Sequence, residues 1–420
     1  MLVRLGLLRD HDFRSLFTAD TISQVGTQVT LLALPLVAVL TLDATALEVG
    51  VLAACETAAF LLVGLPAGAL VDRLRRRGTM IVADVLRAVL LASVPLAWWM
   101  DQLHMPQLYV VGLLCGVCTV FFDVSYQSYL PFLVGKEHLV EGNARLELVR
   151  STSQIGGPTV AGGLIKLLGG PLAIAADAAS YLVSALALWR IRKIEERPVR
   201  KADAHLGREI MEGLKFVLSN RLLRAIAMCT STGNFFGSIV NAMLIIYLAR
   251  NLDLSPAVIG LWFSVTGLGA LAGAFLVNPF VRWFGQGPAM WISMLGAGLG
   301  LLLVPLAQAD WRLWLAAFGY VLFGIGVVVY NVTQVSFRQG ITPDDLLGRM
   351  NATMRFIVWG TMPIGGLVGG ALGHWAGVPE TLWIGCAGSL LSVLPLVLSP
   401  LRKLRELTSA PSAGTEMVRK

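Results

Sequence analysis

The sequence predicts an all-α membrane protein in which twelve transmembrane helices form two six-helix halves. Of the 420 residues, 56% are hydrophobic and only 14% are charged, and the mean hydropathy is +0.71. A soluble domain averages about 25% charged residues. Apolar segments long enough to cross a bilayer recur along the chain, and one long charged connection divides them. Lipid is therefore expected to surround much of the protein, which excludes a soluble fold.

The predicted spans follow from the length of each apolar segment. A bilayer crossing needs about 20 mostly apolar residues, and helices suit it because lipid leaves no water to satisfy backbone polar groups. The 44 glycines favour close contact between helices. We expect spans at 14–40, 47–71, 79–100, 107–133, 143–168, 171–190, 221–249, 255–281, 288–308, 311–335, 350–374 and 379–400.

Basic residues gather in alternate connections, and this pattern predicts the orientation. The positive-inside rule places both termini in the cytoplasm. Because the basic residues lie in these loops, the net charge of +7 does not indicate nucleic-acid binding. We expect a first six-helix bundle at 1–190, a cytoplasmic linker with an amphipathic helix on the membrane surface at 191–220, a second bundle at 221–401 and a cytoplasmic tail at 402–420.

The two halves resemble each other when the sequence is shifted by 208 residues. Asn143 then meets Asn351, and matching glycines follow without a gap: Gly157 with Gly365 and Gly162 with Gly370. Parallel repeats of six helices suit a transporter whose halves rock about a central site.

Two glycine-containing motifs carry most of the functional information. The first follows the second span and reads Gly68-Ala-Leu-Val-Asp72-Arg73-Leu-Arg75-Arg76-Arg77. The second lies in the fifth span and reads Gly156-Gly157-Pro158-Thr-Val-Ala161-Gly162-Gly163. Proline in a helix removes a hydrogen bond and bends the helix, and small residues permit tight packing.

With these motifs the chain resembles the major facilitator superfamily, and within it the bacterial efflux branch that includes enterobactin exporters and macrolide efflux pumps. The first motif matches the superfamily pattern G-x-L-x-D-R-x-G-R-R, except that Arg75 replaces a glycine. The resemblance implies that Asp72 latches the N-terminus of the eleventh helix in the outward-facing state, with Gly68, Arg73, Arg76 and Arg77 in the same gating motif. A basic loop that only sets topology is the alternative.

The second motif resembles the antiporter motif of exporters, with Gly157, Pro158, Ala161 and Gly162 at its matching positions. The resemblance implies a bend that holds one conformation and limits leak. Generic glycine packing is the alternative reading.

Ionisable groups at bilayer depth are costly and therefore candidates for function. Glu56 lies near the middle of the second span, where it could carry a proton or attract a cationic substrate, or be a hydrogen-bonded carboxyl in a wet vestibule. Asp20, Gln24 and Gln28 share one helical face and predict a polar stripe along a water-filled path. A structural pair of Asp20 with an arginine is the alternative.

Other polar residues suggest gates and a cavity wall. Asp123 resembles part of the family's charge relay at the inner helix ends, and Arg150 and Arg355 are expected near that gate. Asp84 and Arg87 are three residues apart and are expected to pair. Asn234 and Asn241 lie seven apart on one face of the seventh span, as cavity candidates.

The resemblance implies a secondary active transporter of the bacterial inner membrane. We expect a proton-coupled antiporter that exports small hydrophobic or cationic compounds, such as drugs, natural products or siderophores; an importer or facilitator of the same fold is the alternative. No protease, nucleophile-elbow or nucleotide-binding motif is present, and the five histidines lie at or near loops. We therefore expect no enzyme activity, cofactor, metal or nucleic acid, and a monomer that uses substrate, protons and lipid as partners.

Overall fold

The computed structural model describes residues 6–71, 74–193, 195, 206–343 and 346–404, and this part is built from helices without strands. The first half contains α1 (His11–Leu40), α2 (Ala46–Val71), α3 (Arg76–Trp99), α4 (Met105–Val134), α5 (Leu139–Leu168) and α6 (Gly170–Trp189), with 3₁₀ turns at Gly6–Arg9 and Lys136–His138.

After α7 (Leu206–Ser219), the second half contains more interrupted helices. They are α8 (Arg221–Ile246) with a π-helical end at Tyr247–Asn251, α9 (Pro256–Phe284), α10 (Gln286–Leu301), α11 (Arg312–Ile341), α12 (Leu347–Trp359), α13 (Thr361–Trp375), α14 (Val378–Ser389) and α15 (Leu394–Val397), with 3₁₀ turns at Val304–Leu306, Leu390–Val393 and Pro400–Lys403.

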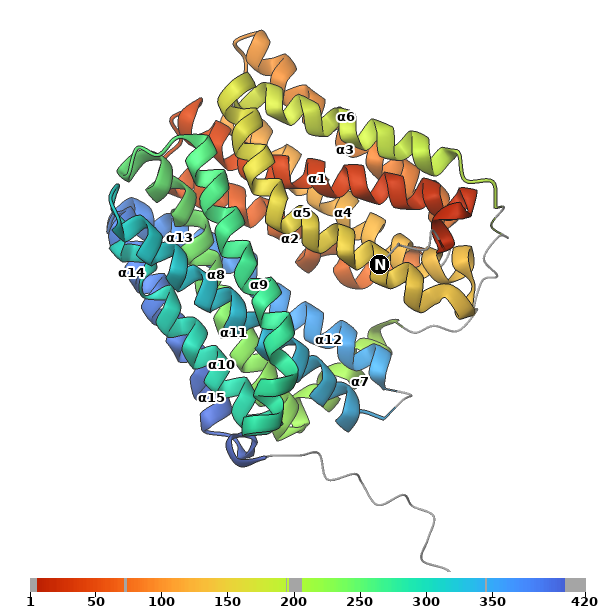
Figure 1. Ribbon diagram of the computed structural model, residues 1–420, viewed down its shortest axis with the longest axis vertical. Helices are drawn as coiled ribbons and strands as arrows, with labels where there is room; N and C mark the ends of the chain where they lie inside the picture. Colours follow the sequence, from red (N-terminus) through yellow and green to blue (C-terminus); the bar gives the residue numbers. More distant parts are fainter. Residues whose placement is uncertain (1–5, 72–73, 194, 196–205, 344–345, 405–420) are drawn as a thin grey trace, which may run out of the picture.

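The helices form two bundles that meet at one end and diverge at the other (Figure 1). We call the end where α1 begins the basic end, because Arg76, Arg77 and Arg349 lie there. The opposite end, where the turn between α1 and α2 lies, is the short-loop end. The all-α membrane fold in two bundles is confirmed.

Eleven helices in the described part are long and apolar enough to cross a membrane. The remaining predicted span, the fifth at 143–168, forms α5 but does not meet the same criterion. Polar residues and glycines lower the hydropathy of α5, and it packs against α1, α6 and α9. Its polar residues Gln154 and Arg150 line the two spaces between the bundles, so they do not have to face lipid.

The internal repeat extends to the turns between helices. Gly169 and Gly377, which correspond under the 208-residue shift, both have positive φ, at 86° and 102°. Asp43 and Asp253 both take the left-handed conformation after the first helix of each half, with φ of 52° and 51°. Aspartate tolerates this conformation better than most residues. The two halves therefore share turn geometry as well as sequence.

The bundles touch through glycines at the short-loop end, where α5 packs on α9 and α2 packs on α13. A Cβ atom built on Gly260 would lie 2.1 Å from the carbonyl oxygen of Pro158, and one on Gly50 would lie 2.4 Å from Cα of Gly370. Both are closer than atoms can approach. The absence of side chains at these glycines thus permits contact between the two backbones at each crossing.

The linker helix α7 packs against the second bundle. Val217 is fully buried, Glu212 pairs with Arg349 of α12 at 2.6 Å, and a Cβ atom on Gly213 would lie 2.8 Å from the Arg349 carbonyl oxygen. The predicted amphipathic helix is present. It also packs against α12, and its location on the membrane surface stays a prediction.

Replacing Gly162 by alanine should separate the bundles at the short-loop end. The added Cβ would lie 2.3 Å from the backbone oxygen of Pro256, whereas at the adjacent Gly163 it would meet nothing within 4 Å. Spin labels at Leu167 and Trp375, both 81% exposed, would report the separation. We expect longer distances for Gly162→Ala and unchanged distances for the Gly163→Ala control; equal distances in both would contradict the proposed contact.

Candidate functional site

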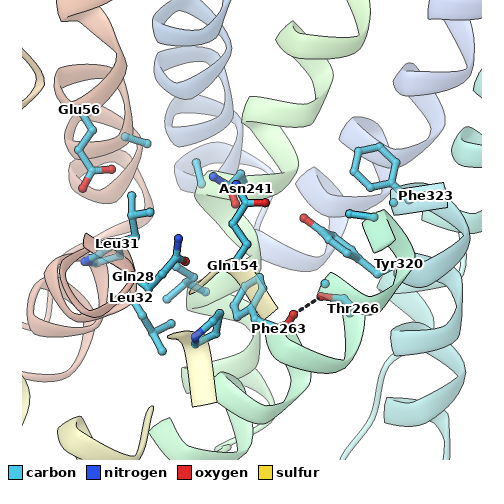
Figure 2. Close-up of a pocket in the computed structure, with 18 of the residues that line it drawn as sticks. Gln28, Leu31, Leu32, Glu56, Gln154, Asn241, Phe263, Thr266, Tyr320 and Phe323 are labelled. Carbon is cyan, nitrogen blue, oxygen red and sulfur yellow. Dashed lines mark hydrogen bonds between the residues drawn. The ribbon is translucent and has the colours of Figure 1, made fainter. Parts of the chain in front are cut away.

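A cavity of about 480 Å³ lies between the two bundles. Its walls are mostly apolar and include Leu31, Leu32 and Phe263, and Tyr320 and Phe323 form the far side from α2 (Figure 2). The polar side chains of its lining are few and come from both halves: Gln28, Glu56, Gln154, Asn241 and Thr266. An apolar pocket with a few convergent polar groups is the usual form of a small-molecule site.

Glu56 is the single acidic residue in this lining. It projects from α2 on the first bundle's side, opposite Tyr320 and Phe323 (Figure 2). Two glycines of α4 lie against it. A Cβ atom built on Gly112 would lie 3.2 Å from Glu56 Cγ, and one built on Gly116 would lie 2.9 Å from the backbone carbonyl oxygen of Glu56. Among the described residues its carboxyl group has no hydrogen bond or ion pair, so it is available to a proton or a cation.

The structure separates the predicted polar stripe of α1. Gln28 reaches the cavity, where Gly157 makes room for it: a Cβ on Gly157 would lie 2.4 Å from Gln28 Cγ. Asp20 and Gln24 lie nearer the basic end and do not line the cavity. Asp20 is only 4% exposed, and Gln24 donates a hydrogen bond to its carboxyl oxygen at 3.4 Å.

The motif of the fifth span lies at the contact between the halves. Pro158 lines the cavity, Ala161 is fully buried, and Gly162 packs against α9. Next to them, the backbone N–H and hydroxyl of Thr159 meet the hydroxyl of Ser264 at 3.0 and 2.8 Å. The motif therefore closes the cavity toward the short-loop end.

Three predicted gating residues lie together in a second space of about 480 Å³ between the bundles, toward the basic end. Asp123 and Arg150 come from the first bundle and Arg355 from the second, and all three are exposed. The Arg355 guanidinium lies 5.8 Å from the ring of Trp359, which meets Phe60 edge-on at 4.5 Å. Opposite charges thus face each other across the diverging bundles.

The remaining gating residues bind within the first bundle. Arg76 donates to the Ser128 carbonyl oxygen at 3.1 Å, and Arg77 donates to the Leu188 carbonyl oxygen at 3.0 Å. No described hydrogen bond joins Arg76 to Asp123. Gly68 belongs to α2, and the predictions for Asp72 and Arg73 fall outside the described residues.

The two predicted asparagines of α8 line connected spaces. Asn241 lines both the central cavity and a chamber that extends from it into the second bundle, whereas Asn234 lines only this chamber and donates to the Val358 carbonyl oxygen at 3.1 Å. A seven-residue spacing places both on one helix face. No group of three or more potential metal ligands occurs among the described residues.

Arg250 forms a clamp between the halves that sequence reasoning missed. Its guanidinium donates to the carbonyl oxygens of Ala44 and Val39, both at 2.6 Å, and to the carboxylate of Asp43 at 2.7 Å. The described hydrogen bonds between the bundles are these and the Thr159–Ser264 pair, all toward the short-loop end. One available signal was that Arg250 is one of few basic residues in the short loops.

The expected pairing of Asp84 and Arg87 creates a buried network in the first bundle. Arg87 donates to Asp84, and the Ser184 hydroxyl donates to the other Asp84 oxygen at 2.6 Å. The Arg87 guanidinium also lies 4.6 Å from the ring centre of Phe122 and 4.2 Å from that of Tyr181. The network connects α3, α4 and α6 at bilayer depth.

Comparison with known proteins identifies relatives over the whole chain. A family model described as transmembrane secretion effector matches residues 4–418. The multidrug efflux pump Tap of Mycolicibacterium fortuitum is 27% identical over 410 residues, covering 94% of this chain and 97% of that protein. The enterobactin exporter EntS of Escherichia coli O1:K1 is 27% identical over 422 residues, covering 99% and 98%.

Solved structures share the fold at low identity. The nucleoside transporter NupG has a TM-score of 0.76 at 12% identity, covering 92% of this chain and 98% of that chain. A bacterial homologue of the iron transporter ferroportin in an inward-facing state has a TM-score of 0.75 at 16% identity, covering 94% and 99%. At this identity the likeness concerns the architecture alone.

Removing the Arg250 clamp should favour conformations that open at the short-loop end. Hydrogen bonds to charged groups contribute about 1.5–3 kcal/mol each, so Arg250→Met should raise the open population by tenfold or more, as about 1.4 kcal/mol corresponds to tenfold. The measurement is the rate at which an impermeant maleimide, applied from the short-loop side, labels a cysteine placed at Val49 (Val49→Cys). Val49 lines the cavity and is only 2% exposed, so labelling requires opening at this end.

The control is Arg312→Met, because Arg312 pairs with Asp310 within its own half at 4.0 Å. An unchanged labelling rate in Arg250→Met, or an equal rise in the control, would count against the clamp.

Removing only the arginine of the buried Asp84–Arg87 pair should destabilise the first bundle. Arg87→Met leaves the Asp84 carboxylate, which is 0% exposed, without its cation, and such a change costs about 3–5 kcal/mol. Thermal unfolding in detergent should show a lower midpoint for Arg87→Met and partial recovery in Asp84→Asn/Arg87→Met. Arg282→Met serves as the control, because Arg282 is exposed. If Arg87→Met unfolded at the same midpoint as this control, the Asp84–Arg87 pair would not stabilise the bundle.

Proposed function

The chain belongs to the transmembrane secretion effector family of the major facilitator superfamily, and from this premise we propose that it exports small hydrophobic or cationic compounds in exchange for protons. Family membership makes it a multi-pass membrane transporter and not an enzyme. The names of Tap and EntS, a multidrug efflux pump and an exporter, support the direction of transport.

The observation that carries the proposal is the carboxyl group of Glu56 at the wall of an apolar cavity between the halves. A carboxylate without a partner is costly at bilayer depth, so Glu56 is stable when it holds a proton or when a cation lies beside it. The two occupants exclude each other, because either one neutralises the same charge. Binding of a cationic substrate then requires release of the proton, which is the elementary requirement of antiport.

The apolar walls extend the range of accepted compounds. Burial of apolar substrate surface contributes about 25 cal/mol per Å², and it requires no particular arrangement of polar groups. Aromatic side chains such as Phe263, Tyr320 and Phe323 can also contact a cation through their faces. This combination of one acid and apolar walls supports a substrate class defined by charge and hydrophobicity.

Alternating access would use the two ends of the contact between the bundles. In the structure the short-loop end is closed by the glycine crossings and Arg250, while Asp123 and Arg355 are exposed toward the basic end. With the basic end in the cytoplasm, as the positive-inside rule favours, this arrangement receives substrate from the cytoplasm. We propose the inner membrane as its location and a monomer as its working unit.

Transport by reconstituted proteoliposomes under an imposed pH gradient tests the proposal, with ethidium as the cationic probe. We expect ethidium to cross the membrane in the direction opposite to the flow of protons, and the accompanying proton movement to be measurable as a pH change. Glu56→Gln should reduce gradient-driven flux to the level of protein-free liposomes, because an amide cannot exchange a proton for a cation. Asp20→Asn is measured in parallel to learn whether a second acid contributes.

The matched control is Glu48→Gln on the same helix, whose carboxylate accepts hydrogen bonds from Thr45 at the helix start. Wild-type flux that ignores the pH gradient would reject antiport and leave a facilitator of the same fold. Coupled flux that survives in Glu56→Gln would instead assign the proton to another residue.

A further inference from the structure

A chamber of about 310 Å³ lies inside the second bundle, beside the central cavity. Its lining comes from α8, α10, α11, α13, the end of α14 and the 3₁₀ turn Leu390–Val393, all within that bundle. Asn241, Tyr320, Phe323 and Val327 line both spaces, and Figure 2 shows the first three at the wall of the central cavity. The chamber is therefore a side extension of the central cavity into one half.

The lining of this chamber is mostly apolar, and the polar side chains in it are uncharged. It includes three side chains that make no described hydrogen bond, Ser238, Asn241 and Asn331, and it contains no carboxylate, amine or guanidinium. The Tyr330 hydroxyl is already paired with Thr230 at 2.6 Å. Polar groups within a membrane bundle require partners, so these side chains can bind hydrogen-bonding groups from a ligand, while a charged group would find no counter-charge.

The internal repeat shows that this space is specific to the second bundle. Under the 208-residue shift, Phe122, Tyr181 and Ser184 correspond to Tyr330, Ser389 and Ser392. In the first bundle, Tyr181 is buried and stacks against the guanidinium of Arg87. In the second bundle, Ser389 and Ser392 line the chamber. A tyrosine is therefore replaced by a serine, and an arginine network by open space.

Glycines of α8 keep the chamber open. A Cβ atom built on Gly237 would meet nothing within 4 Å, and one on Gly233 would lie at ordinary contact distance, 3.5 Å, from Met294 Cε. Both glycines line the chamber. A side chain at Gly237 would thus begin in open space, since its Cβ atom meets no neighbouring helix.

We propose that this chamber is a substrate subsite for an uncharged, hydrogen-bonding group, which extends from a cationic part held near Glu56. The proposal rests on the proposed function, since it assumes that the central cavity binds a cation. The preferred substrates are then bipartite: a positively charged end joined to a neutral body that carries hydroxyl or carbonyl groups. A compact cation uses the central cavity alone and leaves the chamber empty.

Two fluorescent cations distinguish these cases in proteoliposomes. Ethidium is compact, and doxorubicin joins an amino sugar to a larger neutral body with hydroxyl and carbonyl groups. In Gly237→Phe, which fills the chamber, we expect the apparent KM for doxorubicin to rise about tenfold, equivalent to about 1.4 kcal/mol, and that for ethidium to stay within about twofold. Asn331→Leu, which removes one amide and adds little volume, should shift KM in the same direction by a smaller factor.

The matched control is Gly296→Phe, because Gly296 also has open space at its Cβ position but is exposed and does not line the chamber. If both chamber variants transport the two probes as wild type does, the subsite is wrong and the proposed function stands. Equal losses for ethidium and doxorubicin would also overturn it, since they indicate general damage to transport. If wild type transports neither probe under a pH gradient, both the proposed function and the subsite fail.

Discussion

The close contact of helix backbones at the short-loop end is the constraint on which the rest of this structure depends. Gly162 against Gly260, and Gly50 against Gly370, bring α5 onto α9 and α2 onto α13 at distances that side chains would prevent. Lipid is as apolar as the side chains it surrounds, so burial of apolar surface does little to hold helices together in a membrane. Close packing and hydrogen bonds must hold the two bundles together, and both are concentrated at this end.

The central cavity follows from that asymmetry. Because the bundles touch at one end and diverge at the other, they leave space in the middle that neither half can fill. Gly157 belongs to the same motif as Gly162, yet it makes room for Gln28 in the cavity wall. One short segment of α5 therefore lies both at the contact of the short-loop end and in the wall of the cavity.

The two bundles use the same repeat for different purposes. The first fills its interior with the Asp84–Arg87 pair, aromatic rings and hydroxyls, which hold its helices in fixed positions. The second leaves the corresponding interior open, and serine and asparagine side chains lie among its apolar lining. The half that carries Glu56 has a filled interior, and the other half has an open one that adjoins the central cavity.

The sequence by itself determined the all-helical membrane class, the two halves, the repeat and the presence of an acid, Glu56, within the second span, because composition, hydropathy and the position of a charge in an apolar segment are local properties. It also indicated that Gln28 and Asn241 belong to polar helix faces. Only the tertiary structure decided which space each face meets: Asn241 reaches the central cavity and the adjoining chamber, Asn234 reaches the chamber alone, and Asp20 stays outside both. The Arg250 clamp could not be predicted either, since its three acceptors lie more than 200 positions away in sequence.

Helical periodicity fixes the direction of a side chain relative to its own helix axis. The rotation of that helix and the helices it meets depend on packing between segments far apart in the chain.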